Sequence, residues 1–186
     1  MNNYTNILKH FGQFFFKNQL KHLILHVTNH CNFRCSHCFV DFVNPKKDLK
    51  LDKYEEVSKS INDLFWLDIA GGEPFLRKDL HQIINLFKKQ VVSIPTNGYL
   101  LKNIEEQIGL IDKKKTELVI NFSLDGLEKN HNIIRKNPQS WSKVWTTFEA
   151  IRNIKNVKCR IITVIHDGNK HEIIPLMKIV KKSGVD

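Results

Sequence analysis

The sequence of 186 residues contains only four Cys, and no apolar stretch in it approaches the roughly 20 residues that a membrane-spanning helix needs. Secreted domains stapled by disulfides carry a much higher density of Cys, so these thiols are expected to be reduced or to bind a metal. The start of the chain also lacks a cationic segment followed by an apolar core, which a secretory signal would show. These features predict a cytoplasmic protein that does not contact a membrane.

Arginine is scarce as well. Only five of the 29 basic residues are Arg, and against 19 acidic residues they give a formal net charge of +10. Recognition of phosphates and base edges relies on the guanidinium fork, whereas Lys spread along a chain usually forms a solvated surface. A nucleic-acid partner is therefore not expected, although a net charge of +10 would help to hold a polyanion.

Apolar runs rich in β-branched residues alternate with segments of helical period. The expected strands are 22–28, 65–70, 91–96, 117–125 and 157–165, and the expected helices are 53–62, 79–89, 101–111, 141–154 and 171–182. Five βα units in series predict parallel strands joined by right-handed crossovers. The expected fold class is therefore α/β, either a barrel or an open doubly wound sheet.

The domain organisation is expected to be simple. Residues 1–21 are predicted to form an N-terminal helical extension, in which the apolar stripe of 4–17 packs against the core, and residues 22–186 to form one domain. Gly184 marks the end of the last helix, and Val185 and Asp186 resemble the start of another strand. An uncovered sheet edge invites association. We therefore expect a shortened chain, or one that pairs with another.

Polar residues share one face of the predicted strands. In 117–125, one face carries Leu118, Ile120, Phe122 and Leu124, and the other carries Asn121, Ser123 and Asp125. A parallel strand that is covered on both sides is normally apolar on both faces. Polar residues that gather near the carboxyl ends of several strands predict a ligand site at the mouth of a barrel. His26, on the inner face of the first strand, is a candidate for contact with a substrate.

Three of the four Cys lie on a short loop directly after the first predicted strand. Cys31, Cys35 and Cys38 have the spacing C-x3-C-x2-C. Three thiolates can hold three corners of a cubane iron–sulfur cluster and leave one iron without a protein ligand, whereas a ferredoxin-type carrier needs four Cys for each cluster. Cys159, on the fifth predicted strand, is interpreted as a buried structural thiol. The spacing therefore favours a cluster that binds and activates another molecule.

A structural zinc site is the alternative. The three Cys and one of His26, His30 or His37 provide a Cys3His set of ligands. Structural zinc sites usually show two separated pairs of ligands, so the spacing favours the cluster. In the zinc interpretation the protein would be a basic nucleic-acid-binding module.

The cysteine loop and three later motifs resemble those of the radical S-adenosylmethionine (radical SAM) enzymes. The motifs are Gly71-Gly72-Glu73-Pro74 after the second strand, Thr96-Asn97-Gly98 after the third, and Ser123-Leu124-Asp125-Gly126 at the fourth. His37 stands where the family usually carries an aromatic residue, and Asn169 matches a frequent Asn only loosely. The resemblance covers 22–186, and its motifs occur in the family's order.

This resemblance implies a partial (β/α)6 barrel, of which the chain supplies five units and lacks the sixth strand. It implies a 4Fe-4S cluster held by Cys31, Cys35 and Cys38. It also implies a SAM site made by Gly71, Gly72, Glu73, Pro74, Thr96, Asn97, Ser123 and Asp125. Glu73 would meet the amino group of SAM, and Ser123 and Asp125 its ribose or carboxylate.

The implied activity is reductive cleavage of SAM to a 5′-deoxyadenosyl radical, which abstracts hydrogen from a substrate. The stretch with Asn130, His131, Ile134 and Arg135 resembles the subgroup that modifies peptides, cofactor precursors and small metabolites. The implied partners are SAM, that substrate, and an electron donor such as a flavodoxin or ferredoxin. An RNA-modifying enzyme and a non-catalytic fragment that binds only SAM and the cluster remain alternatives. No catalytic acid or base is identified.

Overall fold

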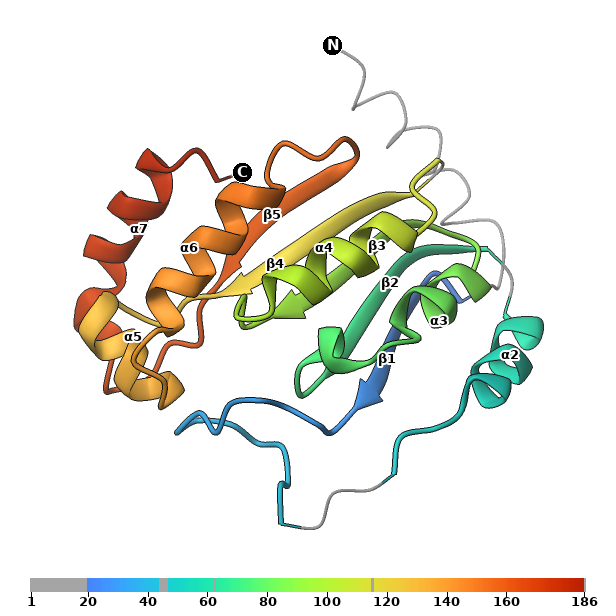
Figure 1. The fold of residues 1–186 in the computed structure, drawn as a ribbon, viewed down its shortest axis with the longest axis horizontal. Coiled ribbons are helices and arrows are strands. Elements are labelled where there is room, and N and C mark those ends of the chain that lie inside the picture. Colours follow the sequence, from blue (N-terminus) through green and yellow to red (C-terminus); the bar gives the residue numbers. More distant parts are fainter. Residues whose placement is uncertain (1–19, 44–46, 62, 115, 186) are drawn as a thin grey trace.

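The computed structural model describes residues 20–43, 47–61, 63–114 and 116–185 (Figure 1). The helix expected within 4–17 lies outside these residues. The strands are β1 (His22–Thr28), β2 (Leu64–Gly71), β3 (Lys89–Thr96), β4 (Glu117–Ser123) and β5 (Val157–Ile162). The α-helices are α2 (Leu51–Ser60), α3 (Leu80–Leu86), α4 (Leu101–Leu110), α5 (Glu128–Arg135), α6 (Ser140–Ile151) and α7 (Ile173–Lys182). Among the described residues, no helix is both long and apolar enough to cross a membrane.

The five strands form one parallel sheet in the order β1-β2-β3-β4-β5, so each strand pairs with the next along the chain. Figure 1 shows α3, α4 and α6 side by side over one face of this sheet. A doubly wound sheet would carry helices on both faces, whereas strands in sequential order with helices outside form a barrel wall. The predicted α/β partial barrel is confirmed.

The core lies between the sheet and these helices. Leu118, Ile120, Phe122 and Leu124 are fully buried, as the strand pattern predicted. The Phe122 ring meets Phe148 of α6 edge to face, with 6.0 Å between the ring centroids. Such aromatic contacts add to the burial of apolar area. This packing fixes which face of β4 looks away from the helices.

Strands β4 and β5 end earlier than predicted, at Ser123 and Ile162. The ladder stops because later groups bond to side chains. The Asp125 carboxylate accepts from the Val164 backbone N–H at 3.0 Å, and the Thr163 hydroxyl donates to the Leu124 carbonyl at 2.7 Å. The extra residues therefore form loops around the strand ends rather than more sheet.

Other boundaries differ by up to three residues, including the end of α3 and the start of β3. Helix α3 ends at Leu86 because Phe87 is extended, and β3 already begins at Lys89, which pairs with Leu64. Asp79 stands at the N-cap of α3, but no side-chain bond caps the helix there, and its carboxylate accepts from Arg77 at 2.7 Å. Helix α5 was not predicted.

The inner face of the sheet is partly open to solvent at its β1 edge. Strand register places Ile24, Asp68, Ser93 and Val119 in one row. Ile24 of β1 is 65% exposed, whereas Ser93 and Val119 of the middle strands are buried, as expected for a parallel sheet that is covered on both faces. A ligand can therefore reach this face at its β1 edge.

Candidate functional site

A cavity of about 520 Å³ lies at the carboxyl ends of the strands. Figure 1 shows the loop after β1 at this end of the sheet. Eight of the predicted site residues line it, namely Cys31, Cys35, Cys38, Gly71, Gly72, Thr96, Asn97 and Ser123. His26 and Arg135 line it as well. Its size is in the range of small-molecule sites. The structure thus brings together segments that are far apart in the sequence.

Three predicted residues do not line this cavity. Glu73 is 1% exposed, Pro74 is buried, and Asp125 is fully buried behind the wall. Their direct contact with SAM stays a prediction. Each carboxylate instead bonds to neighbouring parts of the wall.

The Glu73 carboxylate joins two motifs. One oxygen accepts from the Thr96 hydroxyl at 3.0 Å, and the other accepts from the Asn97 backbone N–H at 2.8 Å. Burial raises the pKa of Glu73 to about 7, although these hydrogen bonds oppose the rise. Glu73 therefore holds the turn after β3 against the glycine turn after β2.

The glycine turn holds the cysteine loop in place. The Gly72 N–H donates to the Thr28 carbonyl and the Glu73 N–H to the His30 carbonyl, both at 2.8 Å. A Cβ on Gly72 would lie 2.3 Å from the His30 oxygen and 2.9 Å from the Cys31 Cβ. The backbones approach so closely that only Gly fits at this position.

The turn after β3 also contacts the cysteine loop. The Asn97 side-chain amide donates to the Asn32 side-chain oxygen at 2.8 Å. The Tyr99 ring packs edge to face against Phe33, with centroids 5.5 Å apart. The loop that carries the three thiols is thus fixed from two sides.

The three thiols share one wall of the cavity, but they are not preassembled. In the part of the chain that the structure describes, no three His, Cys, Asp or Glu side chains stand ready to hold a metal ion. Burial raises the pKa of Cys31 to about 11 and also raises that of Cys35, where Arg135 opposes the rise. Metal binding must therefore release protons from these thiols. A set of soft sulfur donors in one cavity fits an iron–sulfur cluster.

Helix α5 contributes Arg135, to which the sequence assigned no separate role. Its guanidinium lies 2.6 Å from the Asp125 carboxylate and 3.6 Å from the Cys35 sulfur. The His37 ring is 3.8 Å from the same carboxylate. Because α5 is short and mostly polar, only its position four residues after His131 could have drawn attention to Arg135.

His131 contacts the backbone of Asp125 and so helps to fix the Arg135–Asp125 pair. Its Nδ1 accepts from the Asp125 backbone N–H at 3.1 Å, and its Nε2 lies 2.8 Å from the Ser140 hydroxyl. These partners assign the neutral tautomer with the proton on Nε2. Burial, together with the charge of Arg135, lowers the pKa of His131 to about 4.

Replacing His131 with Gln is expected to flatten the acid side of the stability profile. A His whose folded pKa lies below its ordinary 6.5 binds fewer protons in the folded state, so stability falls as the pH drops from 6.5 toward 4. The depression of the pKa corresponds to about 3 kcal/mol over this interval. Denaturant unfolding of both metal-free proteins at pH 7 and pH 4.5 measures the difference. Equal pH dependence of the two proteins would contradict the assignment.

Asn169, the loose match, lies outside the cavity wall. Its fully buried side-chain amide donates to the Asp125 carbonyl at 2.8 Å and to the Val164 carbonyl at 2.7 Å. Asn169 therefore shapes the loops after β4 and β5.

A second polar cluster lies on the inner face, and the sequence assigned no role to its residues. The Asp68 carboxylate lies 2.6 Å from the His22 ring, and it accepts from the Trp66 indole at 2.7 Å and from the Ser93 hydroxyl. Although burial raises the pKa of Asp68, the hydrogen bonds from these three residues hold it below its usual value. Asp68 lies two residues before Ala70 in the cavity wall, about 7 Å deeper along the strand.

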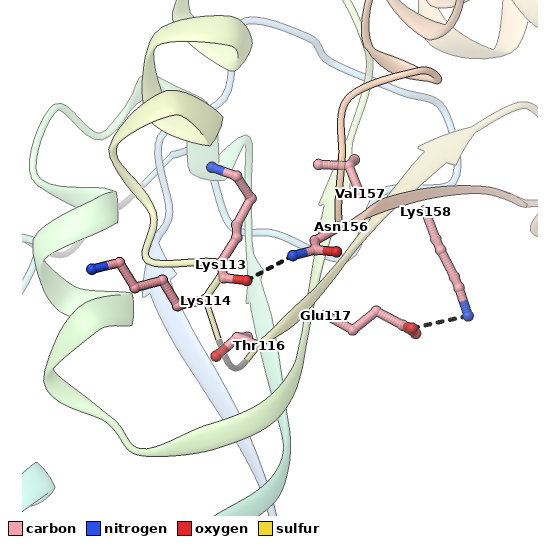
Figure 2. A pocket seen from close by; sticks show the side chains of 7 residues that line it. All are labelled: Lys113, Lys114, Thr116, Glu117, Asn156, Val157 and Lys158. Carbon is pink, nitrogen blue, oxygen red and sulfur yellow. Dashed lines mark hydrogen bonds and ion pairs between the residues drawn. The ribbon is translucent and has the colours of Figure 1, made fainter. Parts of the chain in front are cut away.

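Another cavity, of about 440 Å³, lies among residues from the amino ends of β4 and β5 (Figure 2). Figure 2 shows that its polar groups bond to one another, Asn156 to the Lys113 carbonyl at 3.0 Å and Lys158 to Glu117 at 2.9 Å. The Lys113 ammonium also donates to the Ile111 carbonyl. These contacts give the residues of this cavity a structural role. Most of the predicted site residues line the other cavity, at the opposite end of the strands.

Comparison with family models matches residues 25–180 to the radical SAM superfamily. The match covers all of the motifs and all five strands, apart from the first three residues of β1. This family uses a 4Fe-4S cluster together with SAM, which bears out the predicted cofactors.

Sequence comparison finds similarity to GTP 3′,8-cyclases. The Helicobacter pylori enzyme is 31% identical over 183 residues, which cover 91% of this chain and 55% of the cyclase. A Clostridium botulinum enzyme is 27% identical over 175 residues, 88% of this chain and 54% of the cyclase. The chain spans about half the length of these relatives.

Structure comparison finds the same fold in other proteins, including SuiB and anSMEcpe. Streptococcus suis SuiB bound to S-adenosylmethionine has a TM-score of 0.70 at 21% identity, over 98% of this chain and 43% of SuiB. The structure of anSMEcpe with bound AdoMet has a TM-score of 0.65 at 22% identity, over 89% of this chain and 47% of that protein. At these identities the likeness shows the fold alone.

Proposed function

Because the chain belongs to the radical SAM superfamily, we propose that Cys31, Cys35 and Cys38 hold a 4Fe-4S cluster and that SAM binds beside it in the cavity. When bound, the cluster supplies the electron that cleaves SAM to methionine and a 5′-deoxyadenosyl radical, which abstracts hydrogen from a substrate. One observation carries the proposal. The three thiols and the residues of the later motifs line a single cavity.

The chain's own residues bind and orient SAM. The backbone at Gly71 and Gly72 lets a ligand approach closely, and the polar side chains of Thr96, Asn97 and Ser123 line the same cavity. Glu73 fixes Thr96 and Asn97 through its hydrogen bonds. Glu73 and Asp125 also fix segments next to the cavity through their hydrogen bonds, and their direct contact with SAM is part of this proposal.

We propose that the substrate occupies the part of the inner face that is open at the β1 edge, over the half-buried Asp68 cluster. SuiB has been solved with a precursor peptide, and anSMEcpe with a peptide, whereas the curated relatives are GTP 3′,8-cyclases. The substrate class proposed for this chain is accordingly a peptide, a cofactor precursor or a small metabolite. The electron donor is proposed to be a flavodoxin or ferredoxin, and location in the cytoplasm stays a prediction.

Anaerobic reconstitution with iron and sulfide tests the proposal. We expect about four irons per chain and an electron paramagnetic resonance (EPR) spectrum of the reduced protein that changes when SAM is added. Release of 5′-deoxyadenosine with dithionite as reductant would separate an enzyme from a fragment that only binds SAM. One zinc per chain, no iron and no response to SAM would refute the cluster.

A further inference from the structure

Arg135 connects the cysteine loop to the buried centre of the domain. One guanidinium nitrogen lies 2.6 Å from the Asp125 carboxylate, and another donates to the Cys35 sulfur at 3.6 Å. Arg135 is 8% exposed and Asp125 fully buried, so solvent screens this pair weakly. The guanidinium is therefore a fixed positive charge against a thiol that the proposed function assigns to the cluster.

The backbone holds Arg135 in this place. The Ser36 N–H, next to Cys35, donates to the carbonyl of Ile134, next to Arg135, at 2.9 Å. Helix α5 ends directly after Arg135, because Lys136 adopts a left-handed conformation with φ 51°. The residue before Arg135 is thus hydrogen-bonded to the residue after Cys35. This bond keeps the Arg135 side chain close to the Cys35 sulfur.

A third N–H group of the Arg135 side chain has no hydrogen-bond partner among the described residues. This group, at Nε, is buried, and Arg135 lines the cavity. Leaving a buried donor without an acceptor is costly. Thiolate and sulfide sulfurs of a cluster are acceptors for such a group.

We infer that Arg135 is a positioning residue that orients Cys35 toward the cluster and makes the cluster easier to reduce. This inference rests on the proposed function, since it requires that the three thiols hold a cluster. Reduction adds one negative charge to the cluster, and hydrogen bonds to its sulfurs and nearby charge help to set its reduction potential. A buried guanidinium that donates to Cys35 stabilises the reduced state more than the oxidised state.

The test is a potentiometric titration of the reconstituted protein without SAM, followed by EPR. Replacing Arg135 with Gln removes the charge but keeps a polar side chain, and we expect the midpoint potential to move to a more negative value. Arg152 provides the matched control. It is the half-buried C-cap residue of α6, pairs with Glu149 at 3.0 Å and does not line the cavity, so Arg152→Gln should leave the potential at the wild-type value. Omitting SAM keeps any contact of Arg135 with SAM out of the measurement.

The outcomes separate this inference from the proposed function. Wild-type protein that takes up no iron would refute the cluster itself, whereas an Arg135→Gln protein that titrates at the wild-type potential would refute only the role of Arg135. If Arg135→Gln takes up no iron, Arg135→Lys decides. Its ammonium cannot hold Asp125 and Cys35 with one planar fork, so we expect a more negative potential. A wild-type potential in Arg135→Lys would overturn the inference.

Discussion

Replacing any one of Cys31, Cys35 and Cys38 with Ala is expected to abolish both cluster uptake and SAM cleavage. The three thiols line one cavity, and a cubane already short of a fourth protein ligand has no substitute for a lost thiolate. Iron and sulfide content after anaerobic reconstitution, together with 5′-deoxyadenosine release, measures the effect. Both should fall to the background of the unreconstituted protein.

Cys159 is the internal control for this experiment. It lies on β5 opposite Ile120, 6% exposed and within the core cluster, and it is not part of the cavity wall. Cys159→Ala should therefore keep full iron content and lose about 1 kcal/mol of stability through a small packing defect. If Cys159→Ala lost the cluster as completely as the loop variants, the assignment of three ligands would be wrong.

The strand pattern predicted the fold because buried parallel strands appear in the sequence as short apolar runs separated by helical segments. Alternation in β4 separates Leu118 and Phe122 from Asn121 and Ser123, and the two apolar side chains of this set are fully buried in the core. A ligand site at the carboxyl ends of the strands then follows from the topology alone. The position of the cysteine loop directly after the first predicted strand placed the thiols at this edge.

The orientation of the site side chains was harder to predict than their positions in the sequence. The motifs marked Glu73 and Asp125 as polar residues near the ligand, and the structure adds that both carboxylates are buried and hydrogen-bonded to other segments. Which way a loop residue points depends on donors from distant segments, such as Asn97 for Glu73 and Val164 for Asp125. No local pattern in the sequence contains that information.

Helix α5 also could not be predicted from the local sequence. It spans eight residues, and its sequence EKNHNIIR is mostly polar, so local propensity gives only a weak signal. Its position depends on contacts with other segments, including the bond from Ser36 to Ile134 and the burial of His131. The role proposed for Arg135 rests on its tertiary contact with Cys35, which the local sequence does not reveal.

Gly72→Ala is expected to be the most damaging single substitution outside the three loop cysteines. The new Cβ would lie 2.3 Å from the His30 oxygen and 2.8 Å from the His30 carbonyl carbon, which are backbone atoms and cannot rotate aside. Overpacking of this kind costs about 3 kcal/mol where the backbone must move. Since the displaced segment carries Cys31, we also expect most of the iron uptake to be lost, measured together with denaturant unfolding.

Gly109→Ala is the matched substitution. Gly109 lies on the exposed side of α4, and a Cβ there meets no atom within 4 Å. The same change should therefore stabilise the helix by up to about 1 kcal/mol and leave iron uptake at the wild-type level. A Gly72→Ala protein that folds and binds iron as well as Gly109→Ala would show that the glycine turn does not fix the cysteine loop. Loss confined to Gly72→Ala would mean that the motif after β2 shapes the cluster site through its backbone, before any contact with SAM.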